Sequence, residues 1–333
     1  MLLVTTPGAT SRGLTARLTE QIGPSRVAVY DRVTPNPSLD DLDDAAMGLR
    51  ALAARAIVAV GGGSTLDTAK VLGVTMSSAM ERPLAQIFRM NGVPDWTSTV
   101  PVVAVPTTSG TGAEVTPFAT VWDTVSHRKH SVAGALVYPA HAVLDPELTI
   151  SLPRDETLFS GLDTVSHALE SLWNGNRTCV TAAYARHALT LAGRALPAAL
   201  DDPTDVQERA NMQNAALLAG LAISQSRTAI AHAISYPLTA WFGVPHGLAC
   251  SFTLVELLRA NFDVLVASSI DKETLGTILE LLESFGLGER VRAYASAQGI
   301  LEHQEEIQVA DRLGNYVGAL SDGVAGLIAK SLG

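Results

Sequence analysis

Four side chains in the second half of the sequence are of the types that bind a divalent metal ion. Asp163 and His167 stand four residues apart in "GLDTVSHALES", and His232 and His246 stand fourteen apart in "HAISYPLTAWFGVPHG". Residues four apart share one helix face, with Cβ atoms about 5–6 Å from each other. One carboxylate and three imidazoles suit Fe(II), Zn, Co or Ni, and the sequence does not choose among these metals.

The first pair of this set has a simpler interpretation. Asp163 and His167 alone would form an ordinary hydrogen bond on a helix surface. The segment between the two later histidines contains Pro237, Pro245 and a glycine, so it is not one straight helix. A turn there would let two helices present one imidazole each to a common ion. The remaining histidines lack this context, and we expect them on the surface or in loops: residues 127, 130, 141, 187 and 303.

Two loops rich in glycine and hydroxyl groups are candidates for binding a dinucleotide. "IVAVGGGSTLDTAK" predicts a strand, a glycine turn and a helix start, whose N–H groups and positive dipole end favour a pyrophosphate. Its spacing is not GxGxxG, and a tight strand-to-helix turn is the alternative. "VPTTSGTGAEVTPF" is a second such loop, with a Thr-rich helix cap as its alternative. Ligands gather at the C-terminal strand ends of open α/β sheets, which favours both loops together.

The elements that carry these residues follow two patterns. Strands alternate with helices first: strands are expected at 2–6, 27–31, 56–60 and 100–106, and helices over 11–22, from Ser38 or Asp40, and from about Ser64. This alternation predicts a parallel sheet covered on both faces. From about residue 154, helical periods rich in Ala and Leu dominate. We therefore expect an α/β domain over 1–150 and an all-helical domain over 151–333, with the boundary near 148–156.

Composition limits the class of protein. Hydrophobic residues make up 47% of the 333 positions and charged residues 17%, enough for a large, mainly aliphatic core. A net charge of −10 without a run of Lys or Arg argues against a nucleic-acid partner. No apolar run reaches membrane-spanning length and no basic leader precedes the first apolar residues, so we expect a cytoplasmic protein. Cys179 and Cys250 lack metal-ligand spacing and are too few for a disulfide framework, which fits a reducing compartment.

The motifs "GGGSTLDTAK", "PTTSGTGAEVT", "GLDTVSHALES" and "HAISYPLTAWFGVPHG", in this order, resemble the iron-containing (group III) alcohol dehydrogenase family over residues 1 to about 320. The resemblance implies a dinucleotide-binding α/β domain with a parallel sheet, and an all-α, dehydroquinate synthase-like metal-binding domain. It further implies NAD(P)H, a divalent metal (Fe²⁺ or Zn²⁺) in the cleft between the domains, a small aldehyde or alcohol substrate, and a homodimer.

The resemblance also assigns residues. The implied metal ligands are Asp163, His167, His232 and His246. A turn through Pro237 and Pro245 would bring the last two onto one ion, and Gly247 would leave room beside the fourth ligand. The implied diphosphate site is Gly62, Gly63 and Ser64, and the other implied cofactor residues are Thr6, Asn36, Asp67, Thr107, Thr108, Thr111 and Lys129.

The sequence departs from the family pattern at three places. Family members usually carry an extra strand and helix before residues 2–6, so we expect a shortened N-terminus. Many carry a second histidine four residues after the third ligand, where Tyr236 stands here. This rules out a histidine proton relay and leaves Tyr236 or a water to return the proton. NAD-specific members often end the first strand with Asp. Thr6 stands there, with Ser11 and Arg12 nearby, so we expect NADPH to bind at least as well as NADH.

A narrower resemblance, in "EVTPFATVWD", "HAISYPLT" and "FGVPHGLACSF", is to the branch that reduces phosphonoacetaldehyde to 2-hydroxyethylphosphonate in phosphonate biosynthesis. Arg227 lies five residues before His232 and Thr228 one helical turn before it, and Arg227 would hold the anionic end of such a substrate. A helix-edge arginine paired with a surface carboxylate is the alternative. The other functions left open are a general short-chain alcohol dehydrogenase, a maleylacetate-type reductase, a dehydroquinate synthase-like lyase and a non-enzymatic, oligomer-forming protein.

Overall fold

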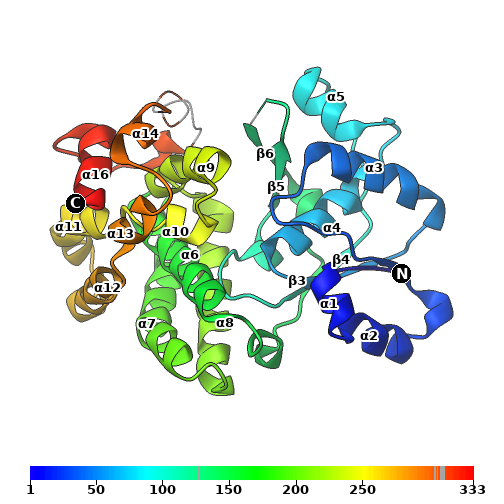
Figure 1. The fold of residues 1–333 in the computed structure, drawn as a ribbon, viewed down its shortest axis with the longest axis horizontal. Helices are drawn as coiled ribbons and strands as arrows, with labels where there is room; N and C mark the ends of the chain where they lie inside the picture. Colours follow the sequence, from blue (N-terminus) through cyan, green and yellow to red (C-terminus); the bar gives the residue numbers. More distant parts are fainter. Residues whose placement is uncertain (127, 304, 306, 308–311) are drawn as a thin grey trace. The chain divides into compact units, whose positions relative to one another are not determined.

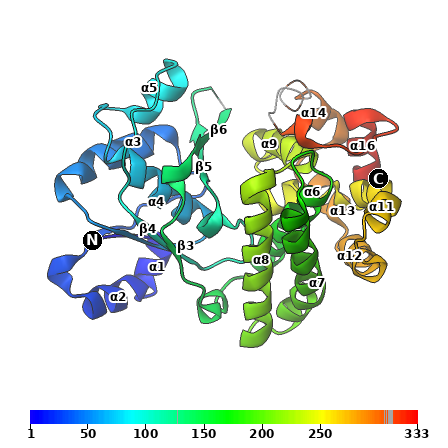
Figure 2. The same cartoon turned by 180° about the vertical axis from the view of Figure 1, so that it is seen from behind.

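A computed structural model describes residues 1–126, 128–303, 305, 307 and 312–333 of the chain. The chain forms two compact units, drawn in Figures 1 and 2. Unit 1 comprises residues 1–108 and 113–148, and unit 2 comprises residues 109–112 and 149–333. The loop Ser109–Gly112 therefore groups with the helical unit. His127, which was expected on the surface or in a loop, lies outside the described residues.

Unit 1 is built on a parallel sheet, which confirms the expectation from the strand–helix alternation. Among the described residues the sheet has five strands in the order β2-β1-β3-β4-β7, and each neighbouring pair is parallel. The register aligns Leu2 with Ala28 on one side and with Ile57 on the other. The strands are β1 (Leu2–Val4), β2 (Ala28–Tyr30), β3 (Ile57–Gly61), β4 (Val102–Pro106) and β7 (His141–Ala142).

Helices cover both faces of this sheet. Figures 1 and 2 show α1 and α2 on one side and α3 and α4 on the other. The helix expected over 11–22 is two helices, because Gly13 takes a left-handed conformation with φ of 81° between them. Ser38 caps α3 by accepting the N–H of Asp41. The helices are α1 (Pro7–Ser11), α2 (Leu14–Ile22), α3 (Leu39–Leu49), α4 (Gly63–Thr75) and α5 (Pro83–Arg89).

An antiparallel hairpin of β5 (Phe118–Asp123) and β6 (Arg128–Ala133) was not expected from the sequence. Arg89 ties it to the helices by donating to Asp123 at 2.6 Å and to Asp40 at 2.8 Å. These hydrogen bonds hold the pKa of Asp123 well below its usual range. The hairpin also corrects one expectation. His130 lies on β6, half-buried, because its ring stacks on Phe88 with centroids 4.6 Å apart.

The described part of unit 2 consists of helices around one apolar core, as expected. The buried helix α6 packs against α7, α8, α9 and α10. No helix in the described ranges is long and apolar enough to cross a membrane. The helices are α6 (Arg154–Leu172), α7 (Cys179–Asp201), α8 (Val206–Ser226), α9 (Ile230–Phe242), α10 (His246–Ala249), α11 (Leu254–Ala267), α12 (Lys272–Ser284), α13 (Leu287–Arg292), α14 (Ala297–Leu301) and α16 (Gly323–Leu332). Short 3₁₀ turns in the two units are η1 (Pro24–Arg26), η2 (Arg50–Leu52), η3 (Ala113–Val115), η4 (Ala135–Val137), η5 (Pro146–Thr149) and η6 (Leu313–Asn315).

The turn between α9 and α10 differs from the expected one. Pro237 lies inside α9 and does not break it, since a proline removes only one backbone hydrogen bond and the surrounding turns are well buried. The helix ends at Gly243, whose φ of 66° is left-handed, and the N–H of Val244 donates to the carbonyl of Leu238. Pro245 then leads directly into α10. Only Pro245 and Gly243 therefore shape the corner.

Candidate functional site

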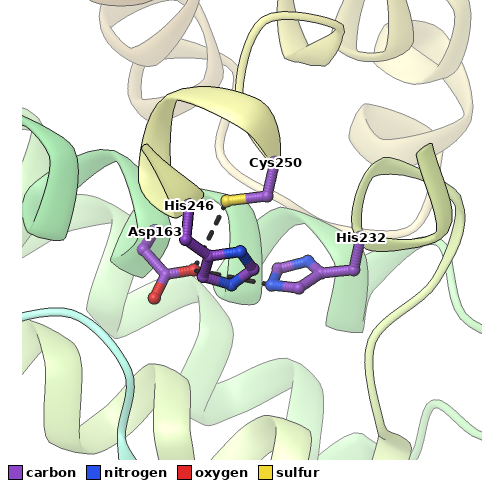
Figure 3. A group of neighbouring side chains, drawn as sticks. All are labelled: Asp163, His232, His246 and Cys250. Atoms are coloured by element: carbon purple, nitrogen blue, oxygen red, sulfur yellow. Dashed lines mark hydrogen bonds and ion pairs between the residues drawn. The ribbon is translucent and has the colours of Figure 1, made fainter. Parts of the chain in front are cut away.

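The four predicted metal ligands converge in unit 2. Asp163 and His167 project from consecutive turns of α6, His232 from the first turn of α9, and His246 from the start of α10. Asp163 Oδ1 lies 3.4 Å from Nε2 of His167, 3.5 Å from Nε2 of His232 and 3.9 Å from Nε2 of His246. Figure 3 shows the His232 and His246 rings directed at this carboxylate. The His246 side chain is 34% exposed, whereas the other three are buried, so the set is open on the His246 side.

Two of these imidazoles are held with Nε2 facing Asp163. Nδ1 of His167 lies 3.3 Å from the carbonyl oxygen of Gly110, which only accepts, so the proton of the neutral ring is on Nδ1. Nδ1 of His232 lies 2.5 Å from a Glu170 oxygen, and its buried Nε2 makes no hydrogen bond among the described residues. The Nε2 lone pairs of His167 and His232 thus face Oδ1 of Asp163 across 3.4–3.5 Å. Because these electron-rich atoms repel one another, a cation bound between them would stabilise the arrangement. The residues therefore fit a divalent ion.

The protonation states of Asp163 and His167 suit metal binding. Burial lowers the pKa of His167 to about 4 against the attraction of Asp163, so the ring is neutral at neutral pH. Burial would raise the pKa of Asp163, but the facing histidines outweigh it and hold that pKa well below its usual range. Burial likewise opposes protonation of His232, yet Glu170 and Asp163 raise its pKa. An ionised carboxylate and neutral imidazoles are the metal-binding forms. The two carboxylates that face His232 favour a positive charge there, so a metal ion that binds takes the place of that charge and releases any proton on Nε2.

Cys250 corrects an expectation, since its place in the sequence gave no sign of a metal site. It lies at the end of α10, and its sulfur is 3.4 Å from Asp163 Oδ1. It belongs with Asp163, His232 and His246 to a group whose ligand atoms all lie within 4.8 Å of one another (Figure 3). Burial raises the pKa of this thiol well above its usual value, so it is a neutral S–H donor to Asp163.

The approach of α10 to α6 places His246. A Cβ atom on Gly247 would lie 1.9 Å from the backbone oxygen of Phe159, so only glycine fits there. The space beside the fourth ligand is thus filled by the backbone of α6. Two hydroxyls fix the contact: Ser166 donates to the carbonyl of Cys250 at 3.0 Å, and Ser251 donates to that of Leu162 at 3.1 Å.

In unit 1 the two glycine- and threonine-rich loops lie side by side at the ends of β3 and β4. Gly62 caps α4, and a Cβ atom on it would lie 3.2 Å from the methyl group of Thr108. The N–H of Thr107 donates to the carbonyl of Gly61 at 3.0 Å. The N–H of Asn36 lies 3.4 Å from the hydroxyl of Ser64. The structure therefore brings Asn36, Gly62, Gly63, Ser64, Thr107 and Thr108 together at the N-terminus of α4.

The other predicted cofactor residues are dispersed. Thr6 caps α1 by accepting the N–H of Ala9 at 3.2 Å. Asp67 accepts the N–H of Thr120 on β5 at 2.8 Å and lies 3.5 Å from the buried Lys70, which gives it a structural role. Lys129 lies on β6 over the ring of Trp122, at 5.9 Å. Thr111 belongs to unit 2.

Arg227 and Thr228 do not lie on the helix of His232, contrary to expectation. α8 ends at Ser226 and α9 begins at Ile230, so both residues lie in the break between helices. The chain reverses there because Arg227 takes a φ of 63°, and the Arg227 side chain is exposed. Its carbonyl accepts from the amide of Asn174 at 3.0 Å.

Arg312 occupies the buried side of this break and was not found from the sequence. It donates to the hydroxyl of Thr228 at 3.0 Å, and its Cζ lies 5.9 Å from the centre of the Tyr236 ring. Tyr236 is half-buried on α9, one turn after His232. Tyr236 and Arg312 are 76 positions apart in the sequence, which explains why no local pattern signals the pair.

Comparison with known proteins identifies the family to which this chain belongs. A family model for iron-containing alcohol dehydrogenases matches residues 1–146, and a model for the C-terminal part of the Fe-containing alcohol dehydrogenase family matches residues 157–329. The chain belongs to the iron-containing alcohol dehydrogenase family. This confirms the resemblance carried by the motifs and the enzyme class, an iron-type alcohol dehydrogenase or aldehyde reductase.

Individual family members differ in substrate. A phosphonoacetaldehyde reductase from Streptomyces viridochromogenes is 38% identical over 283 residues, which are 84% of this chain and 71% of that protein. A 1-propanol dehydrogenase from Salmonella typhimurium is 33% identical over 240 residues, 72% of this chain and 60% of that protein. The structure of a sulfoacetaldehyde reductase from Bifidobacterium kashiwanohense in complex with NAD⁺ superposes with a TM-score of 0.87 at 26% identity, covering 99% of this chain and 90% of that one.

Proposed function

We propose that the chain is a metal-dependent NAD(P)H oxidoreductase that reduces a small anionic aldehyde to an alcohol, with phosphonoacetaldehyde reduced to 2-hydroxyethylphosphonate as the leading candidate. The observation that carries the proposal is the convergence of three imidazole Nε2 atoms on one oxygen of Asp163. Two similar proteins named above are reductases of two-carbon aldehydes that bear a phosphonate or a sulfonate. An anionic aldehyde is the substrate class that they share.

Asp163, His167, His232 and His246 would hold Fe²⁺ or Zn²⁺. When bound, such an ion supplies a Lewis acid that polarises the aldehyde carbonyl, and NAD(P)H supplies the hydride. The product oxygen also needs a proton, which a protein side chain can supply. Tyr236 lies on the face of α9 that carries His232, since the two are four residues apart. We propose that its hydroxyl holds the proton that the product alcohol oxygen receives. Oligomerisation as a homodimer is part of the same proposal.

For the cofactor, we propose that the start of α4 binds the diphosphate. Gly62, Gly63 and Ser64 open a helix of thirteen residues, whose N-terminal end favours an anion. Asn36, Thr107 and Thr108 lie beside it. The family resemblance adds Thr6, Asp67, Thr111 and Lys129 to the proposed cofactor residues, although these four are not gathered at that helix end. Thr6 carries no charge. The guanidinium of Arg12 lies close to Gly8, 3.1 Å from the position that a Cβ atom on Gly8 would occupy. This end of β1 is therefore suited to the 2′-phosphate of NADPH.

Thr6→Asp should shift cofactor preference toward NADH. We expect the ratio of kcat/KM for NADPH to that for NADH to fall at least about tenfold, equivalent to about 1.4 kcal/mol of repulsion between carboxylate and 2′-phosphate. Thr6→Asn is the matched control, because asparagine caps α1 as well as aspartate does but bears no charge. An equal shift in both variants, or a wild type that rejects NADPH, would show that Thr6 does not face the ribose.

For the substrate, we propose that Arg227 holds the anionic group. Its guanidinium is exposed at the break between α8 and α9, where a ligand can reach it, while Arg312 is committed to Thr228 behind it. A guanidinium binds phosphonate or carboxylate oxygens through two parallel hydrogen bonds. Anchoring the anion would aim the carbonyl at the metal ligands, so positioning would contribute to kcat as well as to KM.

Steady-state kinetics with three aldehydes test this assignment. The wild type should prefer phosphonoacetaldehyde to succinic semialdehyde, and both to neutral propanal. Arg227→Ala should lower kcat/KM for the two anions about 10–100-fold, the cost of hydrogen bonds to a charged group, and change that for propanal little. Arg194→Ala is the control, because Arg194 is an exposed arginine on α7, away from the break. Equal losses on all three aldehydes would make Arg227 structural.

A general short-chain alcohol dehydrogenase is the second candidate. The similarity to a 1-propanol dehydrogenase favours it. A wild type that prefers propanal in the same assay would establish this function and reject the anionic substrate. Net oxidation of the nicotinamide during the assay would also distinguish both of these oxidoreductases from a lyase, because a lyase regenerates its cofactor in each turnover.

A further inference from the structure

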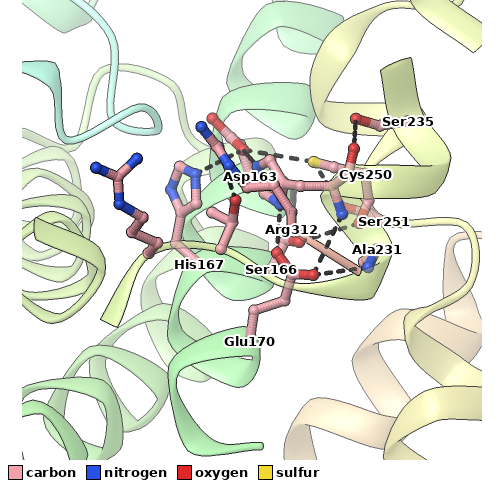
Figure 4. Close-up of polar contacts among 12 residues, drawn as sticks. Asp163, Ser166, His167, Glu170, Ala231, Ser235, Cys250, Ser251 and Arg312 are labelled. Atoms are coloured by element: carbon pink, nitrogen blue, oxygen red, sulfur yellow. Dashed lines mark hydrogen bonds and ion pairs between the residues drawn. The ribbon is translucent and has the colours of Figure 1, made fainter. Parts of the chain in front are cut away.

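Glu170 is a fully buried carboxylate that is not itself one of the proposed metal ligands, cofactor residues or substrate residues. It lies on α6, three residues after His167 and seven after Asp163, so all three share one face of the helix. Both of its oxygens bind the start of α9. Oε1 accepts the backbone N–H of Ala231 at 2.6 Å and of His232 at 3.2 Å, and Oε2 lies 2.5 Å from Nδ1 of His232. Figure 4 shows Glu170 reaching from α6 toward Ala231.

We propose that Glu170 is a positioning residue that fixes His232 in the tautomer able to bind the metal. An ionised carboxylate only accepts hydrogen bonds, so the contact with Nδ1 places a proton on Nδ1 and leaves a lone pair on Nε2. That Nε2 is the buried atom that faces Asp163 at 3.5 Å. The inference rests on the proposed metal centre and adds the residue that prepares one of its ligands.

The other oxygen of Glu170 caps α9. The first N–H groups of a helix have no partner within it, and Ala229 at the cap position offers no side-chain acceptor. Oε1 takes two of these N–H groups, and its negative charge favours the positive end of the helix. One oxygen therefore holds the helix and the other holds the ring. Because the two tasks are divided between two oxygens, one substitution can separate them.

Glu170→Gln separates them by chemistry. The amide oxygen must keep the place of Oε1, since turning the NH₂ group there would set it against two backbone N–H donors. The NH₂ group then faces Nδ1 of His232 and donates to it. The ring proton must move to Nε2, where it blocks the metal. We expect E170Q to keep its helix content but to bind a divalent ion about 10–100-fold more weakly, the usual cost of losing such an outer partner.

The measurement is a titration of metal-free protein with Co²⁺, followed by its visible absorption, with circular dichroism as the check on folding. Glu156→Gln is the matched control, because it makes the same change at an exposed position of the same helix. It should bind Co²⁺ as the wild type does. In a His232→Ala background, E170Q should lower the Co²⁺ affinity little further, because the imidazole ring on which Glu170 acts is absent. If Glu170 had a purely structural role, E170Q would cause the same loss of Co²⁺ affinity in the His232→Ala background as in the wild type.

Wild-type affinity in folded E170Q, or a full additional loss in the His232→Ala background, would overturn the role of Glu170. If E170Q does not fold, nitrogen NMR of histidine-labelled, metal-free wild type decides instead. A proton on Nδ1 of His232 supports the role, and an Nδ1 without a proton overturns it. A wild type that binds no Co²⁺ would reject the metal centre itself, and with it the proposed function.

Discussion

Replacing His246 with alanine should abolish aldehyde reduction and leave the protein folded. His246 is the most exposed of the four proposed ligands, with a side chain 34% exposed, so its removal opens no buried cavity. The loss of one ligand weakens or misplaces the ion, whose stabilisation of charge in the transition state contributes several kcal/mol. A loss of about 4 kcal/mol corresponds to about a thousandfold in kcat/KM.

Three readouts test this expectation: nicotinamide absorbance with phosphonoacetaldehyde, metal content by mass spectrometry and helix content by circular dichroism. His187→Ala is the control, since His187 is exposed on α7 and outside the metal set. The variant should lose metal and rate together, and the control should lose neither. A fully active His246→Ala enzyme after exhaustive chelation would remove His246 from the site.

Each half of the proposed metal set could be predicted from the sequence because its geometry is local, whereas the meeting of the two halves was implied by the residue types and the family resemblance. A spacing of four on a helix places Asp163 and His167 on one face whatever the tertiary context. His232 and His246 required only that the chain turn between them. The position of that turn was wrong, because Pro237 stays within α9 and Gly243 ends it. Prolines show where a helix loses a hydrogen bond, but buried neighbours decide whether it breaks.

The supporting residues depend on contacts between helices, which spacing does not encode. Cys250 reaches Asp163 from 87 residues away, and the fit of Gly247 against Phe159 exists only after α10 packs on α6. Glu170 did carry a signal, since a carboxylate seven residues after Asp163 extends the same helix face. That face is buried, so such a carboxylate needs a specific partner.

In unit 1, too, some features could be predicted from the local sequence and others depend on contacts between elements. Its parallel sheet follows from short apolar strands alternating with helices, and the glycine loops lie where those strands end. The β5–β6 hairpin was missed because the alternating burial along Phe118–Asp123 does not follow residue polarity: Phe118 and Trp122 are half-buried, whereas Asp123 is buried. Its place is set by Arg89, which bridges Asp123 and Asp40 across three elements.

Removal and return of the metal tests the assignment at Asp163 most directly. Chelation should eliminate aldehyde reduction, because the buried carboxylate and imidazoles provide no other Lewis acid for the carbonyl oxygen. Fe²⁺ or Zn²⁺ should restore it. Asp163→Asn, which keeps the shape of the side chain but removes its charge, should remain inactive after the same treatment.

The decisive measurement is the rate of nicotinamide oxidation with phosphonoacetaldehyde, recorded during titration of metal-free protein with Fe²⁺ or Zn²⁺ under anaerobic conditions. The predicted result is no reduction without metal and a rate that rises linearly until one ion is bound per chain, with no response in the Asp163→Asn variant. Full activity in protein that contains no measurable metal, or equal recovery by the Asp163→Asn variant, would contradict the assignment of a metal-dependent reductase centred on Asp163.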